Sequence, residues 1–445
     1  MEPNILIMIA DDATYLDLSL YGGQNVDTPN IDRLAQDGLV FNRAYLPMAM
    51  CNPCRTALYT GLYPARNGSC WNHSAARPGT RSLPHFLGDL GYRVGLCGKK
   101  HVGPNKSFPF EYVPGIEGGC THPDPEFGVA GIRAFVEQDR DAPFCLVTGL
   151  FEPHAPWTLG NPEHFDLDAL QLPPYLADTE ETRGDYAKYL AEIEVLDQEV
   201  GEILAVLDES GKADNTLVIF TSEQGSQFPG CKWTNWNTGV HTGFIVRWPG
   251  VVKPGYTDAV IQYEDVAPTL IEAAGGDSGA IDFDGSSFMS VLLGEADAHR
   301  AFAYFMHNNI PEGPPYPIRA VTDGTYHYIR NLTPEAIYIE KHLMGQFRWH
   351  QYWPTWVFDT TFNEHTRFLV DRYMRRPPEQ LYRMDEDPCE LNNLADDSAH
   401  VEAQKRLSAE LDCWMKQQGD PGAEIDTEDQ WQAAKEGRHF EIQER

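Results

Sequence analysis

A short apolar run near the start of the chain constrains the fold most. Residues 4–10 read NILIMIA, which has the length of a strand and no regular alternation of polar and apolar side chains. Such a run favours a strand buried on both faces of a parallel sheet. Asp11 and Asp12 follow it directly. Because ligands of open α/β sheets bind beyond the carboxyl ends of the strands, these two carboxylates are predicted to lie at a binding site.

Segments of helix and strand length alternate up to about residue 280. Pro29 begins a predicted helix that ends near Gly38, since Pro suits the first turn and Gly suits the stop. The other predicted helices are 83–91, 186–210 and 265–274, and the other predicted strands are 92–96, 144–150 and 216–220. This alternation predicts an α/β fold with a large, mostly parallel sheet sandwiched by helices.

The pattern changes after about Ile281. Short strand-like segments, 318–322 and 325–330, are separated by turn residues, and a last predicted helix spans 398–418. A chain of 445 residues is also long for one ordinary domain. We therefore predict two domains: an α/β domain over residues 1–300, which carries the candidate site, and a smaller C-terminal α+β domain over residues 301–445.

An aromatic segment lies within the second predicted domain, where residues 347–358 read FRWHQYWPTWVF. Aromatic side chains are more often buried than ligand-facing, so we predict that the aromatic side chains between Tyr338 and Tyr373 pack in the interior. A rim on which sugars stack is the alternative.

Charge excludes some classes of partner. The chain has 34 Lys and Arg residues against 66 Asp and Glu residues, a formal net charge of −32. A field of this sign repels phosphate backbones and anionic lipid, so neither a nucleic acid nor a membrane is an expected partner. The same field opposes an anionic substrate, and a pocket for one therefore needs clustered Lys and Arg side chains.

Targeting signals and cysteines constrain the localisation of the protein only weakly. No run of eighteen apolar residues occurs, and the first residues lack a basic region and a cleavable apolar segment. We expect a soluble protein, periplasmic or secreted if an export signal was removed and cytoplasmic otherwise. Nine cysteines are too sparse for a disulfide scaffold and leave the redox compartment open.

The most specific motif is CNPCR at residues 51–55, followed by Thr60-Gly61. It resembles the signature of the formylglycine-dependent sulfatase family, in which a Cys-x-Pro-x-Arg core directs oxidation of the Cys to formylglycine. The resemblance implies an alkaline-phosphatase-like fold, a nucleophile made from Cys51, and a formylglycine-generating enzyme as a partner during maturation. Cys54 departs from the family pattern, which more often has Ser or Ala there.

Cys51 and Cys54 also fit a C-x-x-C redox pair or half of a zinc site. A zinc site needs two further ligands at similar spacing, which the neighbouring sequence lacks, and a redox pair would follow the first strand more closely. The strand that ends at Asp11-Asp12 and the later segment GKKH, residues 98–101, favour the sulfatase interpretation.

The sulfatase chemistry explains why these residue types occur together. A hydrated formylglycine offers two hydroxyl groups, one that attacks sulfur and one that later expels sulfate. A divalent cation held by Asp11 and Asp12, with the residue at Cys51 as a further ligand, would lower the pKa of the attacking hydroxyl. Carboxylate oxygens suit Ca²⁺, with Mg²⁺ as the alternative, although two adjacent aspartates in isolation also fit a solvated turn.

Two more metal ligands are expected after the strand at 216–220. Family members usually carry Asp followed by Asn or His there, whereas this chain has Glu223-Gln224. The exchange keeps a carboxylate and a carboxamide oxygen but lengthens each side chain by one methylene. We expect the backbone to retreat and compensate; weaker metal binding is the alternative.

The resemblance also implies roles for basic residues. Arg55 and Lys99 would hold the formylglycine and its developing charge, His101 would contact its second hydroxyl, and Lys232 would bind the sulfate. His154, in the segment FEPHAP at 151–156, matches the family histidine that protonates the leaving group.

The resemblance spans most of the chain, because Leu381-Tyr382 and ELNNL at 390–394 look like the usual sulfatase tail. RSLP at 81–84 and GKKHVGP at 98–104 resemble the heparan N-sulfatase branch most closely. This implies a sulfated mono- or oligosaccharide as substrate and leaves open whether the sulfate is on nitrogen or oxygen.

Two rival functions stay open at this point. A tetrahedral oxyanion pocket on the same fold also suits a phosphonate or phosphate monoester hydrolase. A non-catalytic protein that binds sulfated glycans, having lost its metal through Glu223-Gln224, is the other. The presence of every expected catalytic side chain favours a hydrolase over a binding protein.

Overall fold

Strand β1 (Asn4–Ala10) lies inside the main sheet, as its uninterrupted apolar sequence predicts. In the computed structural model, which describes residues 2–118, 126–138, 142–346 and 350–436, all seven of its residues are buried. It pairs in parallel with β9 (Thr216–Ser222) on one side and β8 (Phe144–Gly149) on the other. The ends of these three strands therefore meet at one edge of the sheet.

Within the described residues, the main sheet has eight strands in the order β12-β2-β11-β9-β1-β8-β4-β5. Pairing is parallel from β9 to β5 and between β12 and β2, whereas β11 is antiparallel to both of its neighbours. The predicted mostly parallel sheet is confirmed. The strands not yet bounded are β12 (Gly255–Thr257), β2 (Leu39–Phe41), β11 (Phe244–Arg247), β4 (Arg93–Gly98) and β5 (Glu111–Tyr112).

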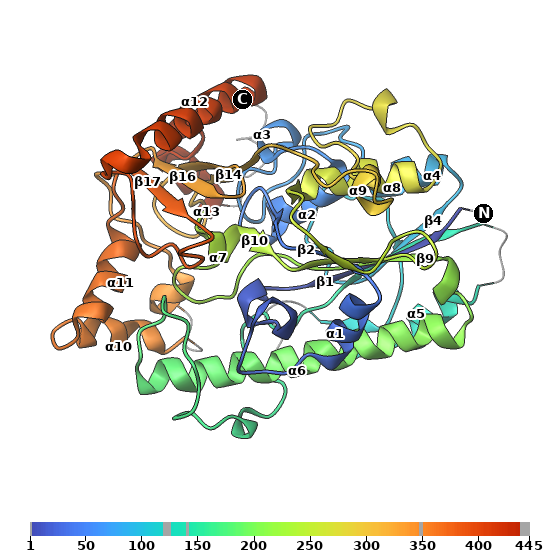
Figure 1. Cartoon of the computed structure of the whole chain (residues 1–445), viewed down its shortest axis with the longest axis horizontal. Coiled ribbons are helices and arrows are strands. Elements are labelled where there is room, and N and C mark those ends of the chain that lie inside the picture. The colour runs from blue at the N-terminus through green and yellow to red at the C-terminus, as the bar shows by residue number, and fades with distance from the viewer. Residues whose placement is uncertain (1, 119–125, 139–141, 347–349, 437–445) are drawn as a thin grey trace.

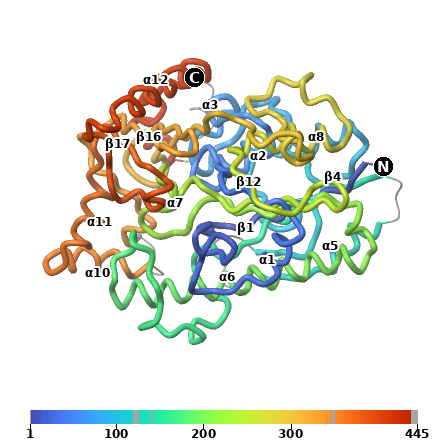
Figure 2. Tube along the Cα trace, viewed as in Figure 1, coloured from blue at the N-terminus to red at the C-terminus, as the bar shows by residue number. Residues whose placement is uncertain are grey.

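Helices cover both faces of this sheet (Figure 1; Figure 2). One face carries α1 (Pro29–Gln36), α5 (Ala130–Val136) and the long helix α6 (Glu180–Glu209). The other carries α2 (Cys51–Thr60), α4 (Leu83–Asp89), α8 (Val266–Ala273) and α9 (Met289–Leu292). The sequence therefore folds into the predicted helix–sheet–helix sandwich.

A second sheet lies toward the C-terminal end of the chain. It is antiparallel, in the order β14 (Ala303–His307), β15 (Ile318–Thr322), β16 (Tyr326–Asn331) and β17 (Glu379–Arg383), and α12 (Val401–Gln418) packs on β15 and β16. This sheet and helix form the smaller α+β unit that the change of pattern predicts. One apolar core runs from Ile5 to Tyr382 through both parts, and the boundary near residue 300 stays a prediction.

The remaining strands and α-helices are short or peripheral. They are the strands β3 (Ala44–Tyr45), β6 (Ile116–Glu117), β7 (Glu126–Phe127), β10 (His241–Thr242) and β13 (Ile261–Gln262), and the helices α3 (Pro64–Asn67), α7 (Asn237–Val240), α10 (Tyr352–Asp359), α11 (Glu364–Met374) and α13 (Glu428–Lys435). Across the described ranges, no helix is both long and apolar enough to cross a bilayer.

The aromatic segment packs for the most part, as predicted. Tyr338, Tyr352, Trp356 and Tyr373 are buried, whereas Phe358 is exposed. Residues 347–349 of the segment lie outside the described part of the chain. The buried rings belong to the core that joins the two sheets, so most of this segment supports the fold.

Candidate active site

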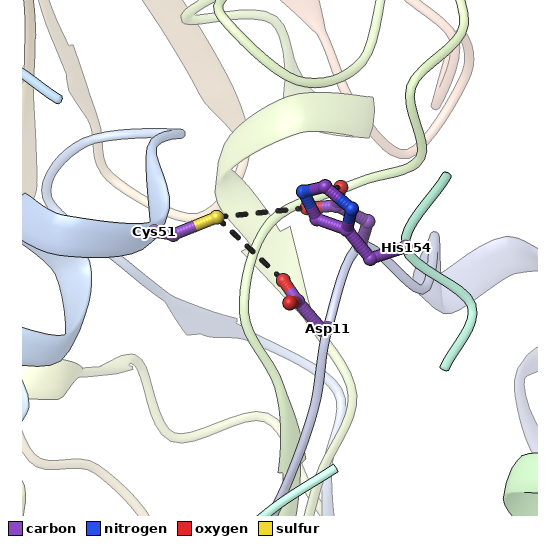
Figure 3. Close-up of side chains that lie close together, drawn as sticks. Asp11, Cys51 and His154 are labelled. Carbon is purple, nitrogen blue, oxygen red and sulfur yellow. Dashed lines mark hydrogen bonds and ion pairs between the residues drawn. The ribbon is translucent and has the colours of Figure 1, made fainter. Parts of the chain in front are cut away.

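The two aspartates after β1 point to one place. Asp12 has a φ of 67°, in the left-handed region, instead of the extended geometry of a strand. This turn breaks the alternation by which successive strand residues face opposite ways. Asp11 Oδ1 and Asp12 Oδ1 consequently lie 3.6 and 4.0 Å from the Sγ atom of Cys51. Figure 3 shows Cys51 facing Asp11, with the ring of His154 nearby.

Cys51 is the first residue of α2, and every residue of this helix is buried. The positive end of a helix dipole favours negative charge at such a position. Burial alone would raise the pKa of the Cys51 thiol, but the ammonium groups of Lys232 and Lys99 lower this pKa well below its ordinary value. The site therefore stabilises negative charge on whatever atom occupies this position.

Three buried cations surround the carboxylates. Lys99 Nζ contacts Asp11 and lies 3.7 Å from Glu223 Oε2, and Lys232 Nζ lies 2.7 Å from Asp12 Oδ2. Arg55 Nε binds Glu223, and Arg55 Nη1 donates to the backbone oxygen of Lys99 at 2.7 Å. The three cations balance three carboxylates, so the pocket does not share the excess negative charge of the whole chain.

Glu223 and Gln224 follow β9 and enter the same pocket. The Glu223 backbone N–H donates to the oxygen of Ala10 at 2.9 Å, which fixes this segment beside the end of β1. Gln224 Nε2 lies 2.5 Å from Asp12 Oδ1 and 3.0 Å from Cys51 Sγ. Gln224 Oε1 is buried and has no hydrogen-bond partner.

These side chains fit a hard divalent cation. Ligand atoms of Asp11, Asp12, Cys51 and His154 all lie within 4.8 Å of one another. Glu223 is not part of that group, and its carboxylate contacts Arg55 and Lys99. A half-turn of the Gln224 amide would direct its unpartnered oxygen toward the carboxylates. A set of carboxylate and amide oxygens is what Ca²⁺ prefers.

His154 lies at the more open side of the pocket. Its Nδ1 atom donates to the oxygen of Ala155 at 2.6 Å, so its Nε2 atom faces the pocket, 3.5 Å from Asp12 Oδ2. Gln227 Nε2 contacts both Asp12 Oδ2, at 2.8 Å, and His154 Nε2, at 2.9 Å. His350 Nε2 in turn lies 3.1 Å from Gln227 Oε1.

His101 occupies another wall of the pocket. It has a φ of 42°, and its backbone oxygen accepts a hydrogen bond from Asn52 Nδ2 at 2.9 Å. Burial lowers the pKa of His101, and a hydrogen bond with Cys51 opposes this effect. His101 Nε2 also lies 2.9 Å from His73 Nδ1.

The structure thus brings together all the predicted site residues: Asp11, Asp12, Cys51, Arg55, Lys99, His101, His154, Glu223, Gln224 and Lys232. Sequence reasoning missed His73, Gln227 and His350. Gln227 follows Gln224 by three residues in the same loop, which is a usable signal. No signal in the sequence indicates His73 or His350, because segments distant along the chain bring these side chains to the pocket.

Taken together, the fold and the pocket are typical of a metal-dependent hydrolase. The pocket combines a buried nucleophile position at a helix start, an oxygen-rich cation site and several fixed positive charges. Comparison with known proteins agrees with this. A sequence model of the family described as Sulfatase matches residues 3–276. The chain is 31% identical over 432 residues to an ulvan-active sulfatase of Formosa agariphila, covering 94% of this chain and 81% of that protein.

Two further relatives cover nearly the whole chain. One is the human N-sulphoglucosamine sulphohydrolase, 27% identical over 472 residues, with 94% of this chain and 91% of that protein covered. The other is the structure of BT4656 in complex with its substrate D-glucosamine-2-N,6-O-disulfate, with a TM-score of 0.69, 20% identity, and coverage of 95% and 99%. The chain belongs to the sulfatase family and is a sulfuric ester hydrolase. The family resemblance drawn from the motif at 51–61 is confirmed.

Proposed function

We propose that this protein removes sulfate ester or sulfamate groups from a sulfated saccharide, using a formylglycine made from Cys51. The observation that carries this proposal is the position of Cys51. It begins a buried helix and lies within 4.0 Å of both aspartate carboxylates, and the charges of Lys232 and Lys99 lower its pKa. The thiol sulfur stands in for the oxygen atoms that the oxidised and hydrated residue would carry.

The proposed cofactor is one Ca²⁺ ion, with Mg²⁺ as the alternative. Asp11, Asp12, Glu223 and Gln224 would hold it, together with the oxygen that replaces the thiol of Cys51. Bound there, the cation and the formylglycine would together supply an activated oxygen nucleophile for sulfur.

The protein side chains would hold charge and move protons. Lys232, which is buried, would bind the sulfate, and the buried side chains of Arg55 and Lys99 would hold the formylglycine and its developing charge. Fixed positive charges of this kind stabilise the negative charge that develops in the transition state. His154 would protonate the leaving oxygen or nitrogen from Nε2, the atom that faces the pocket. His101 would take the proton of the second hydroxyl.

The relatives support a saccharide as the substrate class. Saccharides appear in the names of three of these proteins. They are the ulvan-active sulfatase, the human N-sulphoglucosamine sulphohydrolase and the structure with D-glucosamine-2-N,6-O-disulfate. The clustering of Arg55, Lys99 and Lys232 in the pocket also supports an anionic substrate, in spite of the net charge of −32. A formylglycine-generating enzyme would be the partner during maturation.

The deciding experiment is peptide mass spectrometry of the segment around Cys51, after co-expression with a formylglycine-generating enzyme. We expect the mass decrease that corresponds to loss of sulfur and two hydrogens and gain of one oxygen. Cys54→Ala is the matched control: it changes the neighbouring buried cysteine and should leave the conversion intact. An unmodified Cys51 in both proteins would overturn the proposed nucleophile.

Activity assays complete the test. Cys51→Ala should abolish hydrolysis of aryl sulfate and of sulfated sugars while its thermal unfolding stays cooperative, because only the nucleophile is lost. Turnover of an aryl phosphonate in preference to an aryl sulfate would instead indicate the phosphonate hydrolase. Saccharide binding without any turnover by the converted protein would indicate the binding protein.

A further inference from the structure

A second cluster of charged side chains lies outside the proposed metal site. Within the described ranges, Glu312, Glu340 and His342 form the other group of acidic and histidine side chains whose ligand atoms lie within 4.8 Å of one another. Glu312 Oε1 accepts from Asn72 Nδ2 at 2.8 Å, and Glu312 Oε2 contacts His342 Nε2 and lies 3.3 Å from Lys341 Nζ. Three separate segments of the chain therefore meet at Glu312.

One series of contacts joins this cluster to the pocket through His73. His73 Nδ1 lies 2.9 Å from His101 Nε2, and His73 Nε2 lies 3.9 Å from Glu312 Oε1. His101 in turn is hydrogen-bonded with Cys51. The cluster is thus two side chains away from the proposed nucleophile on this side.

A second series of contacts joins the cluster to Lys232 of the pocket. The ring of Trp233 stacks on His342 with centroids 5.4 Å apart and an interplanar angle of 19°. Lys232 Nζ lies 4.8 Å from the centroid of the Trp233 ring and 2.7 Å from Asp12 Oδ2. The cluster is therefore joined to the pocket in two places, through His73 and through Trp233.

Backbone strain gathers along these links. Five non-glycine residues of the described ranges have a left-handed φ, and four of them, Asp12, His73, His101 and Trp233, belong to the pocket or to its links with the cluster. Strained backbone of this kind concentrates at ligand-binding and catalytic sites, where the surrounding structure holds side chains in a required orientation. His73 and Trp233 share this feature with Asp12 and His101, which supports a role in ligand binding.

Exposure separates the acids of the cluster from its bases. The side chains of Glu312 and Glu340 are 1% and 0% exposed, whereas those of His73, Lys341 and His342 are 55%, 36% and 16% exposed. A ligand that enters beside the pocket therefore meets the imidazole rings of His73 and His342 and the ammonium group of Lys341. The buried carboxylates act behind them and fix the bases in place.

Protein bases already engage the Glu312 carboxylate. The Lys341 ammonium group lies 3.3 Å from Glu312 Oε2, and His342 Nε2 contacts the same oxygen. Burial alone would raise the pKa of Glu312. The hydrogen bond from His342 and the charges of His342 and Lys341 have the larger effect and lower this pKa below its ordinary value, so protein groups already neutralise the carboxylate. An anion is the complementary ligand for what the cluster exposes.

We propose that His73, Lys341 and His342 form a subsite for a second anionic group, a carboxylate or a further sulfate, on the saccharide whose sulfate is cleaved at Cys51. Glu312 is the positioning residue that holds these bases. The inference rests on the proposed function, because it takes the pocket at Cys51 as the place where the first sulfate binds. It makes the protein selective for saccharides that carry two anionic groups close together.

The test measures binding without turnover. Calorimetric titration of the Cys51→Ser protein uses three probes: a monosulfated hexosamine, the corresponding disulfated hexosamine, and a monosulfated disaccharide that contains a uronic acid. We expect the additional Lys341→Met change to weaken binding of one or both doubly anionic probes about tenfold more than binding of the monosulfated hexosamine, the loss of one charge-assisted hydrogen bond. Lys253→Met, which removes an exposed lysine elsewhere, is the control.

Each outcome bears on the proposal. A selective loss for the disulfated probe assigns the subsite to sulfate, and one for the uronic acid probe assigns it to carboxylate. An equal loss for all three probes, no loss, or no binding of any probe overturns the subsite. Because these titrations need neither formylglycine nor turnover, a failure of the proposed catalytic function would appear separately, in the mass spectrum of Cys51 and in the aryl sulfate assay.

Discussion

The side-chain amide of Gln227 lies 2.9 Å from the Nε2 atom of His154. Since Nδ1 of this ring is bound to the backbone oxygen of Ala155, Gln227 completes the fixation of the ring with Nε2 toward the pocket. Gln227 is itself held by Asp12 and His350. The proposed leaving-group acid is thus oriented by a residue that also contacts a proposed metal ligand.

The first prediction concerns Gln227→Ala. Without the amide the His154 ring is free to turn, and protonation of the leaving group becomes slower. We expect turnover of an alkyl or sugar sulfate, which has a poor leaving group, to fall by about tenfold or more. Turnover of a nitrophenyl sulfate, whose leaving group needs little protonation, should fall much less. Gln404→Ala, which removes an amide bound to Glu379 far from the pocket, is the control. An equal fall for both substrates would contradict the orienting role.

The second prediction concerns the longer side chains at 223 and 224. If the backbone compensates for the added methylene, Gln224→Asn withdraws the amide oxygen from the carboxylates and should weaken Ca²⁺ binding about tenfold or more. Calorimetric titration of metal-free protein with Ca²⁺ gives the dissociation constant directly, and the exposed Gln171→Asn serves as the control. Tighter binding in the Gln224→Asn protein would show instead that the longer side chain weakens the metal site.

Much of the fold could be predicted from the sequence, because local signals and burial agree. The apolar run at residues 4–10 forms β1 with the predicted bounds, and the segment 318–322 forms β15. The predicted start of the long helix at residue 186 is wrong, because the periodic apolar pattern begins only near Tyr186. The helix begins at Glu180, where Thr179 accepts a hydrogen bond from the Thr182 N–H and caps the first turn.

The candidate site was predictable where a motif carried it and not elsewhere. Asp11, Cys51 and His101 belong to local patterns that resemble a known family. His73 and Glu312 are placed by loops whose meeting depends on the second sheet and its packing, and no spacing in the sequence encodes that contact. Residues that bind the rest of a substrate can therefore be identified only from the structure.

The third prediction concerns Gly149, the last residue of β8. A Cβ atom there would lie 2.4 Å from the backbone oxygen of Lys99 and 2.9 Å from Arg55 Nη1. Gly149→Ala should therefore displace both groups, lower the free energy of unfolding by about 1–3 kcal/mol and reduce turnover. Gly184→Ala, at a position in α6 with no atom within 4 Å, should instead stabilise the protein by about 0.5–1 kcal/mol. Thermal unfolding and an aryl sulfate assay of both variants measure these effects, and unchanged turnover in Gly149→Ala would contradict the tight approach.

The last prediction concerns two buried carboxyl groups behind the pocket, Glu152 and Glu199, which are hydrogen-bonded to each other. The backbone oxygen of Glu152 binds the Asp11 N–H at 3.1 Å, so this pair supports the loop that carries His154. Burial, followed by the charge of Glu152, raises the pKa of Glu199 to about 11.

A carboxyl group whose pKa is raised in the folded state stabilises the protein fully only below its unfolded pKa, about 4.3 for Glu, and this contribution is lost as the pH rises toward the folded pKa. Glu199→Gln keeps a neutral side chain of the same shape and cannot ionise. The melting temperature of the variant minus that of the wild type should therefore increase from pH 6 to pH 9, measured by thermal unfolding at each pH. Glu181→Gln, an exposed change on the same helix, should show no such gain. A difference between Glu199→Gln and wild type that stays constant with pH would mean that Glu199 is ionised in the folded protein.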